Sequence, residues 1–156
     1  MDKLFAVIDT NVLVSALIST HLDTPPVTVM AHVYSGTITP VYNEEIIQEY
    51  KNVRSRERFH LSPEQIERAI SVILDYGLFS NRTQVEGEVF PDPKDIVFYE
   101  VRMSKEDAYL VTGNIKHFPQ KPFVITPAEM VSIIEIDILP RLKHGGVCQI
   151  NSQMGS

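Results

Sequence analysis

Blocks of hydrophobic and polar residues alternate along the chain and predict strands and helices in turn. The apolar run at 3–8 predicts a strand, and the apolar block at 11–18 predicts a short helix. Pro26 is typical of a helix start and Gly36 of a helix end, so they bound a second helix. A short β stretch at 37–42 follows it. The chain is therefore expected to begin as strand, helix, helix and strand.

Two further helices are predicted from their caps and apolar spacing. Asn43 is a good N-cap for the sequence at 44–54, where apolar residues recur at helical spacing. Ser62 opens a capping box that starts the next helix, and Gly77 ends it. The polar residues at 81–91 are typical of a loop.

The last part of the chain continues the alternation. Asp92 precedes a predicted helix at 96–104, and predicted strands follow at 109–112 and 123–125. A second capping box at Thr126 begins a last helix. Strands that alternate with helices imply right-handed crossovers and a parallel sheet covered on both faces. The predicted fold class is therefore α/β, with three layers in the order α/β/α and a central parallel sheet.

Composition supports one ordinary globular domain with a real core. The chain has 156 residues, of which 44% are hydrophobic and 22% charged. We assign the domain to 1–138 and treat 139–156 as an appended C-terminal tail, either disordered or bound to a partner.

The cellular compartment is predicted from cysteine content and apolar runs. A lone Cys148 excludes an internal disulfide, which fits a reducing compartment such as the cytoplasm. No apolar run approaches the ~20 residues of a membrane span, so we expect no membrane association. The start of the chain leads directly into a strand, so no signal peptide is expected.

Charge is distributed unevenly. The net charge of −6 speaks against a nucleic-acid partner, since such proteins are usually basic. A basic strip nevertheless lies at 51–60 and contains Lys51, Arg54, Arg56 and Arg58. A smaller basic group contains Lys116, His117 and Lys121. An acidic protein with a local basic strip can still bind phosphates; alternatively, the strip is a solvated helix end.

Several familiar catalytic motifs are absent from the sequence. It contains no phosphate-binding G-x-x-x-x-G-K-[ST] loop and no G-x-G-x-x-G word. Its five histidines show no zinc spacing, and no serine lies in a nucleophile-elbow motif. Acidic and amide side chains at the junctions between elements are the remaining candidates for chemistry.

Those candidate side chains occur at four junctions of the predicted elements. They are Asp9, Glu45 with Glu49, Asp92 with Asp95, and Asn114. Each could by itself be an exposed helix residue or a cap. Together, at the carboxyl edge of a parallel sheet, they form a hard-cation site suited to Mg²⁺ or Mn²⁺. Two such ions about 3.5–4 Å apart can activate a water and stabilise the leaving oxygen of a phosphodiester.

Five short sequence motifs resemble those of the PIN domain family and occur in the same order. Within that family they are most similar to the toxin components of toxin–antitoxin systems. They are VIDTNVLVSAL at 7–17, EEIIQEYKNV at 44–53, DPKD at 92–95, AYLVTGNIKHFP at 108–119 and FVITPAEMVSII at 123–134. The resemblance covers roughly 3–136. It implies a PIN-like fold, a Mg²⁺- or Mn²⁺-dependent ribonuclease activity, an RNA substrate and an antitoxin protein as partner. A homodimer is expected from the resemblance together with apolar helices such as the one that contains Val27, Thr28, Val29 and Met30, which can exceed what one core covers.

The resemblance also implies roles for individual residues. Asp9, Glu49 and Asp95 match the first three acids of the family and would ligate the metal. Asn114 stands where the family has a fourth acid, so it would complete the site without a charge. Supporting roles fall to Thr10, Asn11, Thr112, Glu45 and Asp92. The candidates for RNA backbone contact are Lys51, Arg54 and Lys116.

Two other functions are compatible with parts of the sequence. A PIN-like module that binds RNA or protein without efficient cleavage is favoured by Asn114, whereas the three intact acids oppose it. A phosphohydrolase with an Asp nucleophile is the second alternative. Asp9 is followed by Thr10 and Asn11 and lacks a second Asp two residues on, which argues against that class.

Overall fold

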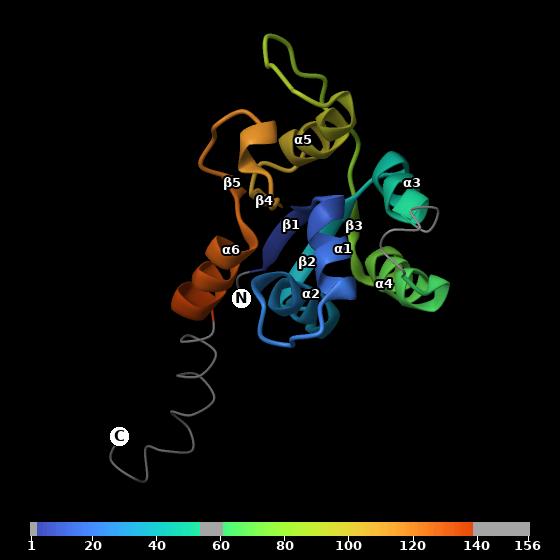
Figure 1. Cartoon of the computed structure of the whole chain (residues 1–156). Coiled ribbons are helices and arrows are strands. Elements are labelled where there is room, and N and C mark those ends of the chain that lie inside the picture. The colour runs from blue at the N-terminus through green and yellow to red at the C-terminus, as the bar shows by residue number, and fades with distance from the viewer. Residues whose placement is uncertain (1–2, 54–60, 139–156) are drawn as a thin grey trace, which may run out of the picture.

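The core of the structure is a parallel sheet, whose strands are labelled in Figure 1. The computed structural model describes residues 3–53 and 61–138. Within these ranges five strands pair in the order β3-β2-β1-β4-β5, and every pairing is parallel. The strands are β1 (Leu4–Ile8), β2 (Ile38–Tyr42), β3 (Leu78–Phe79), β4 (Ala108–Val111) and β5 (Val124–Ile125). Arg54 and the tail at 139–156 lie outside the described residues.

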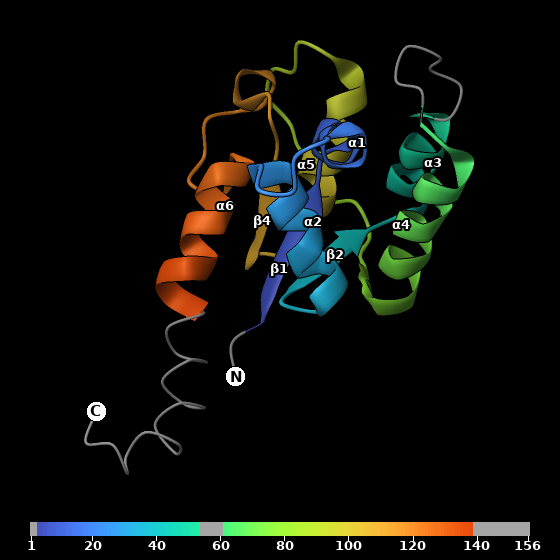
Figure 2. The same cartoon turned by 60° about the horizontal axis from the view of Figure 1, so that its bottom comes forward.

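Helices cover both faces of this sheet, as the two views show (Figure 2). They are α1 (Thr10–Ile18), α2 (Pro25–Ser35), α3 (Glu44–Asn52), α4 (Pro63–Tyr76), α5 (Ile96–Met103) and α6 (Pro127–Ile133). Helices α1, α2 and α6 pack together on one side, whereas α5 lies over β1 and β4 on the other. Helices α3 and α4 form a pair beside β2. The predicted three-layer α/β/α class is confirmed.

The central strand is buried on both faces, which explains its continuous apolar sequence. Ala6, Val7 and Ile8 of β1 are almost fully inaccessible to solvent. The Tyr50 hydroxyl of α3 donates a buried 2.6 Å hydrogen bond to the Ile8 carbonyl, and the Tyr50 ring contacts Phe98 of α5. The tyrosine therefore fixes α3 beside the carboxyl end of β1.

Most predicted helix boundaries agree with the structure because local caps determine them. Asn43, Ser62 and Thr126 each accept a backbone N–H of the following helix, and Ser62 and Thr126 form complete capping boxes. Helix α2 begins at Pro25, one residue earlier than predicted. Helix α5 begins at Ile96, as predicted, and a short 3₁₀ turn, η3 (Pro93–Asp95), precedes it.

The hydrophobic pattern of the sequence predicts no strand where β3 lies. The strand has only two residues, both apolar and both exposed, so its sequence shows no alternation of apolar and polar positions. They join the sheet because Leu78 and Phe79 align with Val41 and Tyr42 of β2. In the described part of the chain, no helix has both the length and the apolar character needed to cross a membrane.

Candidate functional site

A polar pocket of about 390 Å³ lies at the carboxyl ends of β1 and β4. Elements far apart in sequence form its walls: the first turns of α1, the middle of α3, η3 and the turn after β4. The lining residues are Asp9, Thr10, Asn11, Val14, Ser15, Ile18, Glu49, Asp92, Lys94, Asp95, Phe98, Asn114 and His117. This is the edge of an open α/β sheet where ligands usually bind.

Asp9 lies at the bottom of the pocket, between β1 and α1. It is 5% exposed, and its backbone N–H donates to the Val111 carbonyl, which ties it to β4. The Thr112 hydroxyl donates a 2.7 Å hydrogen bond to Oδ2 of Asp9. Burial nevertheless raises the pKa of Asp9 to about 6, and the nearby carboxylate of Asp95 adds to this rise. The hydrogen bond from Thr112 and the influence of His117 lower the pKa of Asp9 but do not offset this rise.

The turn after β4 is held against the same edge by side-chain hydrogen bonds. Thr112 is fully buried, and its hydroxyl oxygen accepts the backbone N–H of Asn114 at 3.0 Å. The Asn11 side-chain oxygen accepts the Gly113 N–H at 3.2 Å. Asn11 therefore shapes this turn. The arrangement leaves the Asn114 side chain at the pocket wall.

Asp95 enters the pocket from η3, opposite Asp9. Asp92 caps η3 by accepting the Lys94 backbone N–H at 3.0 Å. Burial raises the pKa of Asp95, the charge of Asp92 raises it further, and His117 lowers it. Nδ1 of His117 lies 3.3 Å from Oδ2 of Asp95, but the two atoms are not aligned as a hydrogen bond.

Two oxygen atoms of this pocket are buried without a hydrogen-bond partner among the described residues. They are Oγ1 of Thr10 and Oδ2 of Asp95. An unpaired buried polar atom is costly, so native structures usually satisfy it with water or an ion. Hard oxygen donors of this kind fit Mg²⁺ or Mn²⁺.

The acidic residues line one pocket, but their side chains do not surround a single metal position. Glu49 of α3 is half-buried at the pocket wall, close enough for its charge to raise the pKa of Asp95. Across 3–53 and 61–138, no three His, Cys, Asp or Glu side chains lie close enough to ligate one ion together. Mg²⁺ commonly takes one or two carboxylates and keeps several waters. The donor set therefore fits a partly hydrated cation.

Other candidate residues lie elsewhere. Glu45 does not line the pocket, because its carboxylate pairs with Arg82 at 2.8 Å and is 57% exposed. Lys51 is exposed and borders a different hollow, between α3 and α4. Lys116 is exposed in η4 (Ile115–His117), next to the pocket residue His117.

Sequence reasoning did not identify several residues of the pocket wall. Lys94 lies within the DPKD word between two acids, and only the acids carry a sequence signal for metal binding. Val14, Ser15 and Ile18 belong to a predicted helix, yet with Asn11 they follow the helical spacing i, i+3, i+4, i+7. That spacing could have placed them on the face that begins beside Asp9.

Comparison with known proteins gives one match. A family model described as PIN domain matches residues 6–116, most of the chain. The matched segment runs from β1 into η4 and includes each acidic residue of the pocket. No curated protein and no solved structure matches the chain.

Proposed function

The chain belongs to the PIN domain family, and from this premise we propose that it is a Mg²⁺- or Mn²⁺-dependent endoribonuclease. PIN domains are generally nucleases, so hydrolysis of a phosphodiester is the expected reaction class. The observation that carries the proposal is that Asp9 and Asp95, both with a raised pKa, line one pocket. Two buried oxygens of this pocket have no hydrogen-bond partner among the described residues. A divalent cation would satisfy both features at once.

Each acid has a distinct part in this proposal. Asp9 and Asp95 would hold the cation, and Glu49 would contribute a third carboxylate to the same pocket. The cation would supply an activated water and stabilise the leaving oxygen of the phosphodiester. Thr112 keeps Asp9 oriented through its 2.7 Å hydrogen bond. Asn114 presents an amide at the pocket wall that can accept or donate a hydrogen bond to the substrate.

The remaining walls of the pocket suit an RNA strand. Lys94 and His117 lie beside the acids and would contact the phosphate, and Lys94 would supply positive charge next to an otherwise negative site. Val14, Ile18 and Phe98 form an apolar side, on which a sugar or base can pack without losing hydrogen bonds.

The test is cleavage of a single-stranded RNA by purified protein in Mn²⁺, with EDTA in a parallel sample. We expect cleavage that EDTA abolishes and that Asp9→Asn removes, because this variant loses the most buried negative charge of the site. Glu44→Gln is the matched control, since it removes an exposed carboxylate from the first turn of α3. Cleavage that survives either EDTA or Asp9→Asn would show a contaminating nuclease and refute the mechanism.

A second candidate is an RNA- or protein-binding module with weak or no cleavage. Asn114 supports it, because the amide supplies no charge where a fourth acid would strengthen metal binding. This alternative expects RNA retention at low salt, no cleavage in Mn²⁺ and no effect of EDTA on retention.

In the cell, we propose, the protein acts in the cytoplasm as the toxin of a toxin–antitoxin module, with an antitoxin protein as partner. The support is the resemblance of five ordered sequence words to that group of PIN domains, together with the lone cysteine. Induced expression should arrest bacterial growth, and Asp9→Asn at the same protein level should relieve the arrest. Equal arrest by both proteins would contradict the toxin role.

A further inference from the structure

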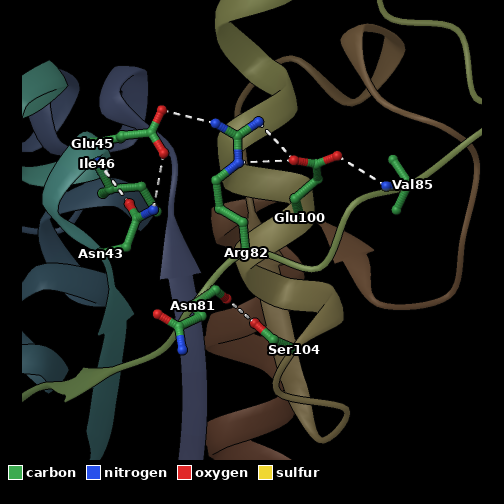
Figure 3. A network of polar contacts seen from close by, with 8 residues as sticks. All are labelled: Asn43, Glu45, Ile46, Asn81, Arg82, Val85, Glu100 and Ser104. Atoms are coloured by element: carbon green, nitrogen blue, oxygen red, sulfur yellow. Dashed lines mark hydrogen bonds and ion pairs between the residues drawn. The ribbon is translucent and has the colours of Figure 1, made fainter.

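Arg82, in the loop between β3 and η3, joins two helices that flank the pocket (Figure 3). One terminal nitrogen of its guanidinium lies 2.8 Å from the Glu45 carboxylate of α3. The other terminal nitrogen lies 2.6 Å from Glu100 of α5, and Nε also donates to Glu100 at 2.8 Å. One side chain therefore binds a carboxylate from each helix.

The connection to α5 is the stronger half of this bridge. Glu100 is 6% exposed, and its second carboxylate oxygen accepts the Val85 backbone N–H at 2.9 Å. Its backbone carbonyl accepts the Thr83 N–H at 3.0 Å. Several bonds thus bind the loop segment to α5, and Arg82 is held rigidly on that side.

The connection to α3 reaches the first turn of that helix. Asn43, the N-cap of α3, accepts the Ile46 N–H through its side-chain oxygen and donates its amide to Glu45 at 3.4 Å. Glu45 therefore links the cap of α3 to Arg82. Tyr50 anchors the later part of the same helix to β1. Glu49 lies between these two anchors, one helical turn after Glu45.

We propose that Arg82 is a positioning residue that fixes α3 against α5 and thereby sets where Glu49 stands relative to Asp95. This inference rests on the proposed metal-dependent function. Tyr50 fixes α3 at one point, and its apolar contact with Phe98, with ring centroids 6.4 Å apart, is not directional. A guanidinium that binds two carboxylates in a fixed fork adds a directional contact at a second point. Glu45 therefore contributes to the site indirectly, by receiving Arg82.

The exposure of the bridge limits the size of its effect. The Arg82 side chain is 33% exposed and Glu45 57% exposed, and ion pairs at such positions contribute little to stability. A change of about three- to fivefold in metal affinity is the expected scale.

The test compares Arg82→Lys, Glu45→Ala and the control Glu44→Ala. Lys retains the charge but lacks the planar fork with which Arg82 holds Glu45 and Glu100 at fixed angles. Glu44 is exposed in the same turn as Glu45, so its removal matches the change in charge and cap dipole. Two readouts are measured: Mn²⁺ affinity by calorimetry, and amide hydrogen exchange of the metal-free protein in EDTA.

We expect Arg82→Lys and Glu45→Ala each to weaken Mn²⁺ binding by about three- to fivefold, and Glu44→Ala by less than about twofold. The double variant of Arg82 and Glu45 should lose less affinity than the sum of the two single losses, because both changes remove the Arg82–Glu45 contact. Exchange protection of 44–52 should fall in both variants and stay unchanged in the control.

Two results would overturn the positioning role: unchanged exchange of 44–52 in Arg82→Lys, or faster exchange with wild-type Mn²⁺ affinity. Failure of the proposed function looks different. If wild-type protein binds no Mn²⁺ while α3 exchanges faster in both variants, the metal-dependent function is refuted and the α3–α5 bridge is supported.

Discussion

At the scale of single residues, the pocket brings carboxylates together where solvent cannot fully screen them. Asp9 is almost fully buried, Asp95 is half-buried, and burial raises the pKa of both. Such an arrangement lowers the stability of the metal-free protein, and a bound cation would recover that cost. Residues that destabilise a fold in this way are typical of functional sites.

Asp9→Asn should therefore stabilise the metal-free protein, and more so at higher pH. The pKa of Asp9 is about 6 in the folded protein against an ordinary value of 3.8. The folded state then binds more protons between these values, so the free energy of unfolding falls as pH rises through about 6. The expected gain for Asp9→Asn is up to about 3 kcal/mol near pH 7.5 and about 0.5 kcal/mol near pH 4.

Urea denaturation in EDTA at the two pH values measures this gain. Glu44→Gln serves as the control because its carboxylate is exposed. A gain of equal size at both pH values would contradict the assignment of the cost to ionised Asp9.

Asn114→Asp tests whether the missing fourth charge limits the site. An added carboxylate at the pocket wall raises the charge count, on which hard-cation affinity depends. We expect Mn²⁺ binding to tighten by about tenfold, equal to about 1.4 kcal/mol, and RNA cleavage to increase. Calorimetry and a cleavage assay at fixed low salt measure the two effects. Unchanged Mn²⁺ affinity would place Asn114 outside the metal's surroundings.

At the scale of elements, two glycines end helices for different physical reasons. Gly36 follows α2 with φ +88°, and a Cβ there would meet only open space, so only its backbone conformation favours glycine. Gly77 follows α4 with φ −83°, but a Cβ there would lie 2.3 Å from the Ile73 carbonyl and 2.7 Å from the Pro40 carbonyl. Gly77 therefore permits the close approach of α4 to β2.

Substitutions at the two glycines should differ in kind. Gly77→Ala should cost about 1–3 kcal/mol, because α4 and β2 must move apart. Gly36→Ala should cost about 1 kcal/mol, and Gly36→Asn less, since Asn adopts the left-handed conformation more readily. Thermal and urea denaturation measure these losses. A Gly77→Asn variant as stable as wild type would contradict the steric explanation.

At the scale of the whole molecule, the distribution of charge determines how RNA can reach the acids. The net charge is −6, yet Lys94 lies in the pocket and Lys116 is exposed next to the pocket residue His117. Lys51, by contrast, lies at a hollow between α3 and α4. RNA attraction should therefore be local and sensitive to salt.

Lys94→Ala and Lys51→Ala should separate these two regions. Each phosphate contact with a single strand contributes about 0.7 to the slope of log affinity against log salt concentration. We expect Lys94→Ala to reduce this slope by about that amount and Lys51→Ala to leave it unchanged. Fluorescence anisotropy of a labelled RNA in Ca²⁺ measures both. A reduced slope in Lys51→Ala alone would move the RNA path to the α3–α4 side.

The homodimer stays a prediction, and the structure changes its basis. Val29 and Met30 of α2 are buried within the protomer, so this apolar stretch does not support self-association. Exposed apolar side chains occur instead along the segment from the end of α4 into β3; they are Leu74, Tyr76, Leu78 and Phe79. We predict a dimer through this corner, measured by light scattering, and a monomer for Tyr76→Glu. A wild-type protein that stays monomeric at high concentration would contradict it.

The order of the elements other than β3, and most of their ends, could be predicted from the sequence. Caps such as Asn43 and Ser62 act on backbone groups three residues away, so their effect is local and readable. The sequence also placed Asp9 and Asn114 at the ends of two strands, and so at one edge of a parallel sheet; that these strands are neighbours comes from the structure.

Only the tertiary structure decided which side chains share the pocket. Glu45 and Glu49 lie four residues apart on the same predicted helix, and both are candidate ligands by sequence. In the structure Glu45 forms an ion pair with Arg82, whereas Glu49 lines the pocket. The contact of His117 with Asp95 and the pairing of β3 with β2 likewise join distant segments. Local periodicity cannot encode such contacts, because they depend on how separate elements pack. The physical reason is that a side chain's partner is set by distance in space, which the sequence specifies only through the complete fold.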